Sequence, residues 1–193
     1  MNKSILLSGV GGQGTVLASR LIAAAAMDRD EQARTAETIG MSQRGGCVVS
    51  HVRIGQDIYS SLIPLGKADM IIGFEAGEAV RVFPYLKNGG TVVVNKSIIA
   101  PVTASLSDFQ YLAENMIAYL REHAGKVIVV DGEAIAEKCG SSKVLNMALL
   151  GAAIASGELG ISMEEMEMAT QAKVKPAFFE MNRKALALGA ELA

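Results

Sequence analysis

The chain contains no tryptophan, and aromatic residues make up only 5% of its 193 residues. Few side chains are therefore available to stack on nucleic-acid bases. Lysine and arginine number 18 against 20 aspartates and glutamates, which gives a formal net charge of −2. No basic excess is present to attract a phosphate backbone or an anionic membrane. The composition thus argues against a nucleic-acid-binding protein.

Cysteine is equally scarce, since Cys47 and Cys139 are the only two. Two cysteines far apart in the sequence exclude a site of four cysteine ligands, for zinc or for an iron–sulfur cluster, within one chain. They also argue against a disulfide-rich protein, so we expect a reducing environment.

Long apolar runs are missing as well. The longest, residues 21–27, is much shorter than the ~20 residues that a membrane-spanning helix requires. The first residues, MNKSILLSGVGGQG, carry one lysine and a short apolar stretch that glycines soon interrupt, which is unlike a secretory signal. We therefore expect a soluble, cytoplasmic protein.

What the chain does contain is typical of one compact domain. Half of its residues are apolar and a fifth are charged, as in ordinary globular proteins. A chain of this length can bury roughly 70% of its unfolded surface without a metal or a disulfide. Because no linker or internal repeat interrupts the sequence, we predict one domain over residues 1–193.

Apolar runs and helical periodicity alternate along this chain. The pattern predicts strands at residues 4–10, 70–74, 91–95 and 127–130, and helices at 15–27, 133–138, 144–156, 164–173 and 177–188. Such alternation predicts an α/β fold: a Rossmann-like domain of three layers, with a mostly parallel sheet and a helical C-terminal third. An antiparallel hairpin is predicted from 47–54 and 58–62, whereas 34–37 form at best a weak, short strand.

A glycine-rich turn joins the first predicted strand to the first predicted helix. Gly9, Gly11 and Gly14 form the pattern GxGxxG, and the same run includes Gly12 and Gln13. Glycines permit a tight turn with a close backbone approach, and amide groups at a helix N-terminus attract an anion. We predict that this turn contacts a phosphate, a carboxylate or a partner chain. A turn that needs glycine only for its shape is the simpler alternative.

A dinucleotide such as NAD is the obvious ligand for this pattern, but the sequence supports it weakly. The NAD fingerprint requires an acidic residue at the end of the second strand, about 20 residues further on, to hold the ribose. That region reads QARTAETIG and lacks a strong apolar strand, so Glu37 is the only reasonable candidate. A stand-alone Rossmann-type protein that binds NAD(P) or a nucleotide remains the alternative interpretation.

A second candidate segment consists of Ser42, Gln43, Arg44 and Gly45. An arginine beside glycines, flanked by hydroxyl and amide side chains, can clamp a phosphate or a carboxylate with two hydrogen bonds. We expect this loop to face the same edge of the sheet as the glycine turn. An ordinary solvated loop is the alternative.

Other polar residues favour structural roles. His51 has no cysteine or second histidine at ligand spacing, which favours a satisfied strand histidine. Glu75 and Glu78 share one predicted helix face, by default a solvated one, although an acid/base pair is possible. Asn146 interrupts an apolar helix and, if buried, must find a partner. Since no catalytic triad or metal cluster is visible, we predict no catalytic or metal-binding residues.

Taken together, several segments resemble the gamma-type subunit of 2-oxoacid:ferredoxin oxidoreductases. They read SGVGGQG (8–14), ETIGMSQRGGCVVSHVRIG (37–55), ADMIIGFEAGEAVR (68–81), NKSIIAP (95–101), DGEAIAEKCGSSKVLNMALLGA (131–152) and KVKPAFFEMNRKAL (173–186). Within this family, the sequence is most similar to the small subunit of the indolepyruvate type.

The resemblance implies a reaction in which a 2-oxoacid, coenzyme A and oxidised ferredoxin give an acyl-CoA, carbon dioxide and reduced ferredoxin. It also implies that thiamine diphosphate and the 4Fe-4S clusters are bound by a large partner subunit, and that ferredoxin meets the complex rather than this chain alone. For the indolepyruvate type, the substrates are aryl pyruvates. The small subunit would complete the assembly without being catalytic by itself, and its apolar C-terminal helices would suit a symmetric dimer or a contact with the partner.

Overall fold

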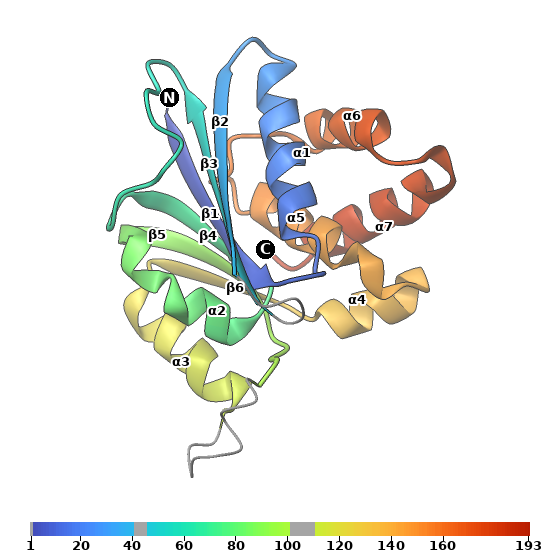
Figure 1. Ribbon diagram of the computed structural model, residues 1–193. Helices are drawn as coiled ribbons and strands as arrows, with labels where there is room; N and C mark the ends of the chain where they lie inside the picture. Colours follow the sequence, from blue (N-terminus) through green and yellow to red (C-terminus); the bar gives the residue numbers. More distant parts are fainter. Residues whose placement is uncertain (1, 41–45, 101–110) are drawn as a thin grey trace.

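The computed structural model describes residues 2–40, 46–100 and 111–193, and its strands form a six-stranded sheet in the order β2-β3-β1-β4-β5-β6 (Figure 1). The strands are β1 (Lys3–Val10), β2 (Gln32–Ile39), β3 (Cys47–Gly55), β4 (Ala68–Gly73), β5 (Leu86–Asn95) and β6 (Lys126–Val130). The helices are α1 (Thr15–Met27), α2 (Ala76–Arg81), α3 (Ala113–His123), α4 (Gly132–Cys139), α5 (Leu145–Ala155), α6 (Met163–Lys173) and α7 (Phe179–Ala190).

Parallel pairing dominates the sheet. Strands β1, β4, β5 and β6 pair in parallel, while β3 is antiparallel to both β1 and β2. Five strands therefore point the same way and β3 points the other way. Ile5, Leu6 and Leu7 in β1 are all fully buried, as expected for a central strand with both faces covered. The predicted α/β class, with a mostly parallel sheet and an antiparallel hairpin, is confirmed.

The position of the hairpin was predicted wrongly. Residues 58–62 form no strand, and β3 pairs instead with β2, which is eight residues long and exceeds the weak strand predicted at 34–37. β2 is an edge strand with mostly exposed side chains, so its sequence lacks the apolar alternation from which strands are predicted. Ile58, at the start of the segment predicted as a strand, is buried instead in a loop, together with the nearby Ile63.

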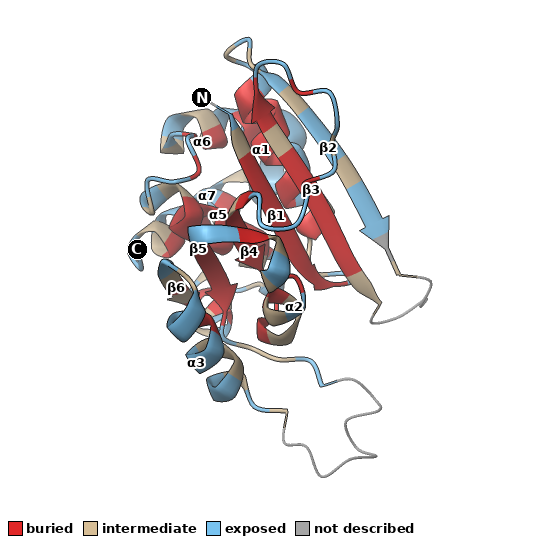
Figure 2. Cartoon of the chain, turned by 90° about the vertical axis from the view of Figure 1, so that its left-hand side faces the viewer, coloured by how far each residue is buried: buried red, intermediate tan, exposed pale blue. Residues whose placement is uncertain are grey.

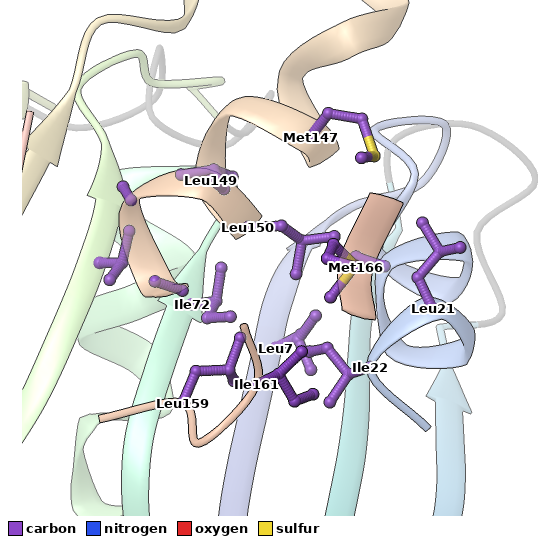
Figure 3. Packing of buried hydrophobic residues seen from close by; sticks show 14 of the residues in the cluster. Leu7, Leu21, Ile22, Ile72, Met147, Leu149, Leu150, Leu159, Ile161 and Met166 are labelled. Atoms are coloured by element: carbon purple, nitrogen blue, oxygen red, sulfur yellow. The ribbon is translucent and has the colours of Figure 1, made fainter. Parts of the chain in front are cut away.

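Helices cover both faces of the sheet and create two cores (Figure 1). On one face, α1 packs on β1, β2 and β3, and α5 packs on β5 and β6, with α4, α6 and α7 further out. Figure 3 shows Leu7 and Ile72 from the sheet meeting Leu21, Leu150 and Met166 from the helices in the larger core. The smaller core lies beneath α2 and α3.

The predicted helical C-terminal third is present and packs against the sheet through α5. Residues 146–153 of α5 are all buried, which explains why its sequence is apolar on every side. Within the described residues, no helix is both long enough and apolar enough to cross a membrane.

Helices α5 and α7 cross with their backbones in contact. A β-carbon added to Gly151 of α5 would lie 1.9 Å from the carbonyl oxygen of Leu186, and one added to Gly189 of α7 would lie 1.9 Å from that of Ala148. Two glycines thus permit a close approach that any side chain would prevent.

We expect Gly151→Ala to destabilise the fold, because the added methyl group forces α5 and α7 apart. The cost of such overpacking is about 2 kcal/mol, more than the gain in helix propensity. Urea unfolding followed by circular dichroism measures the change. Ala187→Leu, which enlarges an exposed position of α7, is the matched control and should leave the midpoint unchanged. A Gly151→Ala variant as stable as the wild type would contradict the close crossing.

Candidate anion-binding site

The glycine turn predicted from the sequence lies between the end of β1 and the start of α1. Gly12 and Gly14 have φ angles of 96° and 90°, a backbone conformation that side chains with a β-carbon rarely adopt. Gly14 is the N-cap of α1, and it supplies no side-chain acceptor for the first amides of the helix. The first turn of α1 contains no acidic residue either. These amides are therefore available for an external anion.

Gln13 holds the turn in shape with its side-chain amide. Its Oε1 accepts a hydrogen bond from the backbone N–H of Val10 at 2.7 Å, and its Nε2 donates to the carbonyl oxygen of Phe74 at 3.3 Å. A β-carbon on Gly9 would lie only 2.7 Å from Gln13 Oε1 and from Phe74 Cβ. Gly9 and Gln13, both predicted as site residues, are thus coupled to each other and to the loop after β4.

Asn95, which the sequence analysis missed, extends this arrangement across the sheet. The residue is buried at the end of β5; its Nδ2 donates to the same Phe74 oxygen at 3.2 Å, and its Oδ1 accepts from the N–H of Gly132 at 3.1 Å. Two amides therefore link the ends of β1, β4 and β5 with the start of α4. The sequence feature that could have indicated this role is an asparagine directly after a run of β-branched residues typical of a buried strand.

The second predicted segment, Ser42, Gln43, Arg44 and Gly45, lies outside the described residues. The residues on either side of it are described, and Gly46 accepts a hydrogen bond at 2.9 Å from the N–H of Gly11 in the glycine turn. Gly40 donates to the carbonyl oxygen of Cys47 at 2.8 Å. Gly46, which follows this segment directly, therefore touches the glycine turn, at the edge of the sheet where the sequence predicted the loop.

Two pockets adjoin the turn. The larger, of about 530 Å³, is lined by Gly12, Gln13, Gly14, Leu17, Ser142, Lys143, Leu145 and Asn146. Lys143 is the charged residue of this lining, so the pocket combines an ammonium group with the N-terminus of α1. The smaller pocket, of about 280 Å³, includes Thr15, whose buried hydroxyl has no partner among the described residues. Amides, a lysine and a hydroxyl together favour an anionic ligand.

Asn146 packs on the turn from α5. It is 3% exposed, and its Nδ2 would lie 3.3 Å from a β-carbon placed on Gly14. Its Oδ1 accepts from the backbone N–H of Met147 at 3.0 Å. The expectation that a buried Asn146 finds a partner is thus met by a local hydrogen bond.

His51 is a satisfied strand histidine, as predicted. It is 6% exposed, its Nδ1 accepts from the N–H of Ile63 at 3.1 Å, and its ring lies edge-on to Tyr85 at 5.8 Å. Burial lowers the pKa of His51 below the usual value of 6.5, since the charged imidazolium would lose its hydration. His51 therefore belongs to the core and not to a site.

Glu75 does not lie on a solvated helix face, so the default expectation was wrong for this residue. It is 1% exposed and caps α2 by accepting from the N–H of Glu78 at 2.6 Å. Its other oxygen accepts from the N–H of Ile99 at 3.1 Å and from the hydroxyl of Tyr111 at 3.3 Å. Burial first, and the Glu75 carboxylate second, raise the pKa of Tyr111 to about 12. Glu75 is thus a structural carboxylate that joins three segments.

The described residues contain no group of three or more histidine, cysteine, aspartate or glutamate side chains placed to hold a metal ion. Cys47 and Cys139 are both free and only partly buried. The residues described here therefore do not fit an iron–sulfur cluster.

The topology also bears on the dinucleotide alternative. A Rossmann unit places its second strand directly beside the first, so that an acidic residue at its end can reach the ribose. Here β3 separates β2 from β1, and Glu37 of β2 forms an ion pair with Arg20 at 3.8 Å. The glycine turn is present without the neighbouring acidic strand that NAD recognition uses.

Comparison with known proteins gives the family. The model of the pyruvate ferredoxin/flavodoxin oxidoreductase family matches residues 4–192. The chain belongs to this family. Among its relatives, indolepyruvate oxidoreductase subunit IorB of Archaeoglobus fulgidus is 40% identical over 191 residues, which cover 98% of this chain and 94% of that protein. IorB of Thermococcus kodakarensis is 36% identical over 192 residues, with 98% and 95% covered.

Two solved structures share the fold. The gamma subunit of a keto/oxoacid ferredoxin oxidoreductase from Geobacter sulfurreducens has a TM-score of 0.72 and 25% identity, with 100% of this chain and 96% of that chain covered. A 2-oxoglutarate:ferredoxin oxidoreductase from Magnetococcus marinus has a TM-score of 0.73 and 20% identity, and the match covers all of this chain but 31% of that one. The same fold thus occurs both as a separate subunit and as part of a larger chain.

We expect Asn95→Ala to destabilise the protein by about 2 kcal/mol, because the buried N–H of Gly132 loses its acceptor. Thermal unfolding followed by calorimetry measures the loss. Asn115→Ala removes the same amide from an exposed position of α3 and should change the stability by less than about 0.5 kcal/mol. Equal stability of the two variants would show that the Asn95 amide does not join the strand ends.

Proposed function

We propose that this chain is the small subunit of an indolepyruvate-type 2-oxoacid ferredoxin oxidoreductase that acts on aryl pyruvates. The observation that carries the substrate class is a difference in similarity. Four relatives named as indolepyruvate oxidoreductase subunits are 36–40% identical over nearly the whole chain. Relatives named for pyruvate, ketoisovalerate or 2-oxoglutarate are 26–28% identical over similar lengths.

In this proposal, the enzyme converts an aryl pyruvate, coenzyme A and oxidised ferredoxin into an aryl acyl-CoA, carbon dioxide and reduced ferredoxin. The carbon–carbon bond to the carboxylate breaks and carbon dioxide leaves, and the remaining acyl carbon is then oxidised by two electrons, which two one-electron ferredoxins accept. The acyl group forms a thioester with coenzyme A, and the thiol proton is released. The 4Fe-4S clusters would belong to the large partner subunit, because two cysteines cannot hold a cluster. The family resemblance implies that thiamine diphosphate is bound there too. This chain completes the complex and is not catalytic alone.

At its junction with the large subunit, this chain would bind an anionic group. Gly9, Gly11, Gly12, Gln13 and Gly14 would form one side of this site, and Ser42, Gln43, Arg44 and Gly45 the other. The hydrogen bond between Gly11 and Gly46 supports their proximity. Coenzyme A carries several phosphates and the oxoacid carries a carboxylate, and both suit the amides at the start of α1 together with Arg44 and Lys143. The anion would be oriented here while the bonds change on the partner.

Purification of the tagged chain from its native host under anaerobic conditions tests the function. We expect a large chain to co-purify with the brown absorbance of iron–sulfur clusters and with thiamine diphosphate. The complex should then reduce ferredoxin with aryl pyruvates in a coenzyme A-dependent reaction, and faster than with pyruvate. Recovery of the chain alone with NAD(P) bound would overturn the proposal in favour of a stand-alone nucleotide-binding protein. Recovery alone and without ligand would point to an isolated homologue.

Arg44→Ala tests the anion site within this complex. Because one bidentate contact to a phosphate or a carboxylate is lost, we expect the apparent KM for coenzyme A or for the oxoacid to rise about tenfold, with a smaller change in kcat. Steady-state kinetics with each substrate varied in turn identifies which anion is bound. Arg183→Ala, at an exposed position of α7, is the control. Unchanged kinetics for both substrates would remove Arg44 from the site.

A further inference from the structure

The loop of residues 56–67, which joins β3 to β4, carries an unusual set of exposed side chains. Ile58 and Ile63 are each 2% exposed and anchor the loop to the protein. Tyr59, Leu62 and Leu65 point outward instead and are 87%, 56% and 64% exposed. Figure 2 views this face of the sheet, where the loop lies in front of β3 while α2 and α3 lie over the other half of the sheet. Tyr59 and Leu62 lie on either side of Ser60, which accepts a hydrogen bond from Arg53 of β3, whereas Leu65 precedes Gly66, which donates to Pro84 just before β5.

Two arginines lie beneath this loop on neighbouring strands. Arg34 of β2 and Arg53 of β3 are directly opposite each other in the antiparallel pairing, so both side chains are on the same face. Each one donates to a carbonyl oxygen of the loop: Arg34 to Ile58, and Arg53 to Ser60 at 3.0 Å. Like charges in directly opposite positions destabilise a sheet. The loop carbonyls offset this repulsion only in part, because they carry no formal charge.

Neither arginine has an acidic partner within the described part of the chain. Arg20, Arg29, Arg81 and Arg183 each form ion pairs with glutamates, at distances from 2.5 to 3.9 Å. Arg34 and Arg53 form no such pair there, although the loop itself contains Asp57. The Nε of Arg53 is buried and has no acceptor among the described atoms. The two guanidinium groups thus carry positive charges that no described carboxylate balances, and one N–H of Arg53 lacks an acceptor.

We propose that Arg34 and Arg53, together with Tyr59 and Leu62, form a docking surface for a carboxylate-bearing segment of the large subunit. A carboxylate accepts two parallel hydrogen bonds from a guanidinium group, and one acidic side chain placed between the arginines would relieve their repulsion. Arginine and tyrosine are also the residues that most often dominate binding energy in protein interfaces. We call these four residues the arginine–tyrosine surface.

This surface is separate from the anion-binding site. Arg53 pairs across the sheet with Ser4, near the start of β1, whereas the glycine turn follows Val10 at the other end of that strand. Six residues of strand place the two features roughly 20 Å apart. A change at the arginine–tyrosine surface therefore alters assembly without touching the residues proposed to bind the substrate anion.

The inference rests on the proposed function, and its test uses the two purified subunits of that complex. Calorimetry or interferometry measures the affinity of the wild type and of the variant Arg34→Glu/Arg53→Glu for the large subunit at several salt concentrations. We expect the wild-type affinity to fall as salt rises and the double variant to bind at least about tenfold more weakly. Arg121→Glu reverses the charge of an exposed residue of α3, outside this surface, and should bind like the wild type.

Because the arginines also hold the loop, a second variant separates docking from folding. Tyr59→Ala changes a side chain that is 87% exposed, so its thermal midpoint should stay unchanged while its affinity falls about fivefold. Met27→Ala, at a 55% exposed position at the end of α1, is the control. If both the Arg34→Glu/Arg53→Glu and the Tyr59→Ala variants bind the large subunit with wild-type affinity, the proposed docking surface is wrong.

Cross-linking identifies the partner groups directly. Arg34→Lys/Arg53→Lys keeps both charges and supplies amines that a carbodiimide can join to carboxylates in contact. Mass spectrometry should find residue 34 or 53 bonded to an aspartate or a glutamate of the large subunit. Bonds to carboxylates of this chain alone would contradict the proposal. If the wild type forms no complex with the large subunit, the proposed function is wrong. If the complex forms and is active but the variants bind with unchanged affinity, only the docking surface is wrong.

Discussion

The carbonyl oxygen of Phe74 accepts hydrogen bonds from two side-chain amides, those of Gln13 and Asn95. Phe74 directly follows β4, Gln13 comes from the turn after β1, and Asn95 ends β5. Through Gly132, Asn95 also fixes the start of α4. Parallel strands end at the same edge of a sheet, and backbone hydrogen bonds, such as those from Ala76 to Ser97 and from Lys96 to Val130, also join their connecting loops. These amides make that edge one connected structure.

The properties of the anion-binding site follow from this edge. With Gln13 turned inward, the glycine turn presents backbone amides rather than side chains to the solvent. Gly14 caps α1 without a side-chain acceptor, which leaves the N-terminus of the helix open to an external anion. The candidate site would therefore attract a charged group through backbone dipoles and Lys143. This arrangement suits a subunit that positions a substrate while the chemistry takes place on another chain.

The position of β2 at the edge of the sheet, beyond β3, has two consequences. The insertion of β3 between β1 and β2 moves Glu37 away from the place where a dinucleotide ribose would bind. The same insertion places Arg34 opposite Arg53 on a face that only a loop covers. A sheet that no longer fits a dinucleotide thereby offers a positively charged surface near its opposite edge.

The sequence by itself determined the α/β class, the glycine turn and the helical C-terminal third. These features depend on local periodicity and on backbone conformations that glycine adopts easily, so neighbouring residues are enough to reveal them. Family resemblance added the enzyme class, which matching residues across the chain now support.

Only the tertiary structure decided which strand pairs with β3, because β2 is exposed on its edge and carries no apolar pattern, whereas the loop at 58–62 does. It also decided the roles of Asn95 and Glu75, which form hydrogen bonds to residues more than 20 positions away, and the meeting of Arg34 with Arg53. Contacts between distant residues arise from the register and order of strands, and these depend on the packing of the whole sheet rather than on any single segment.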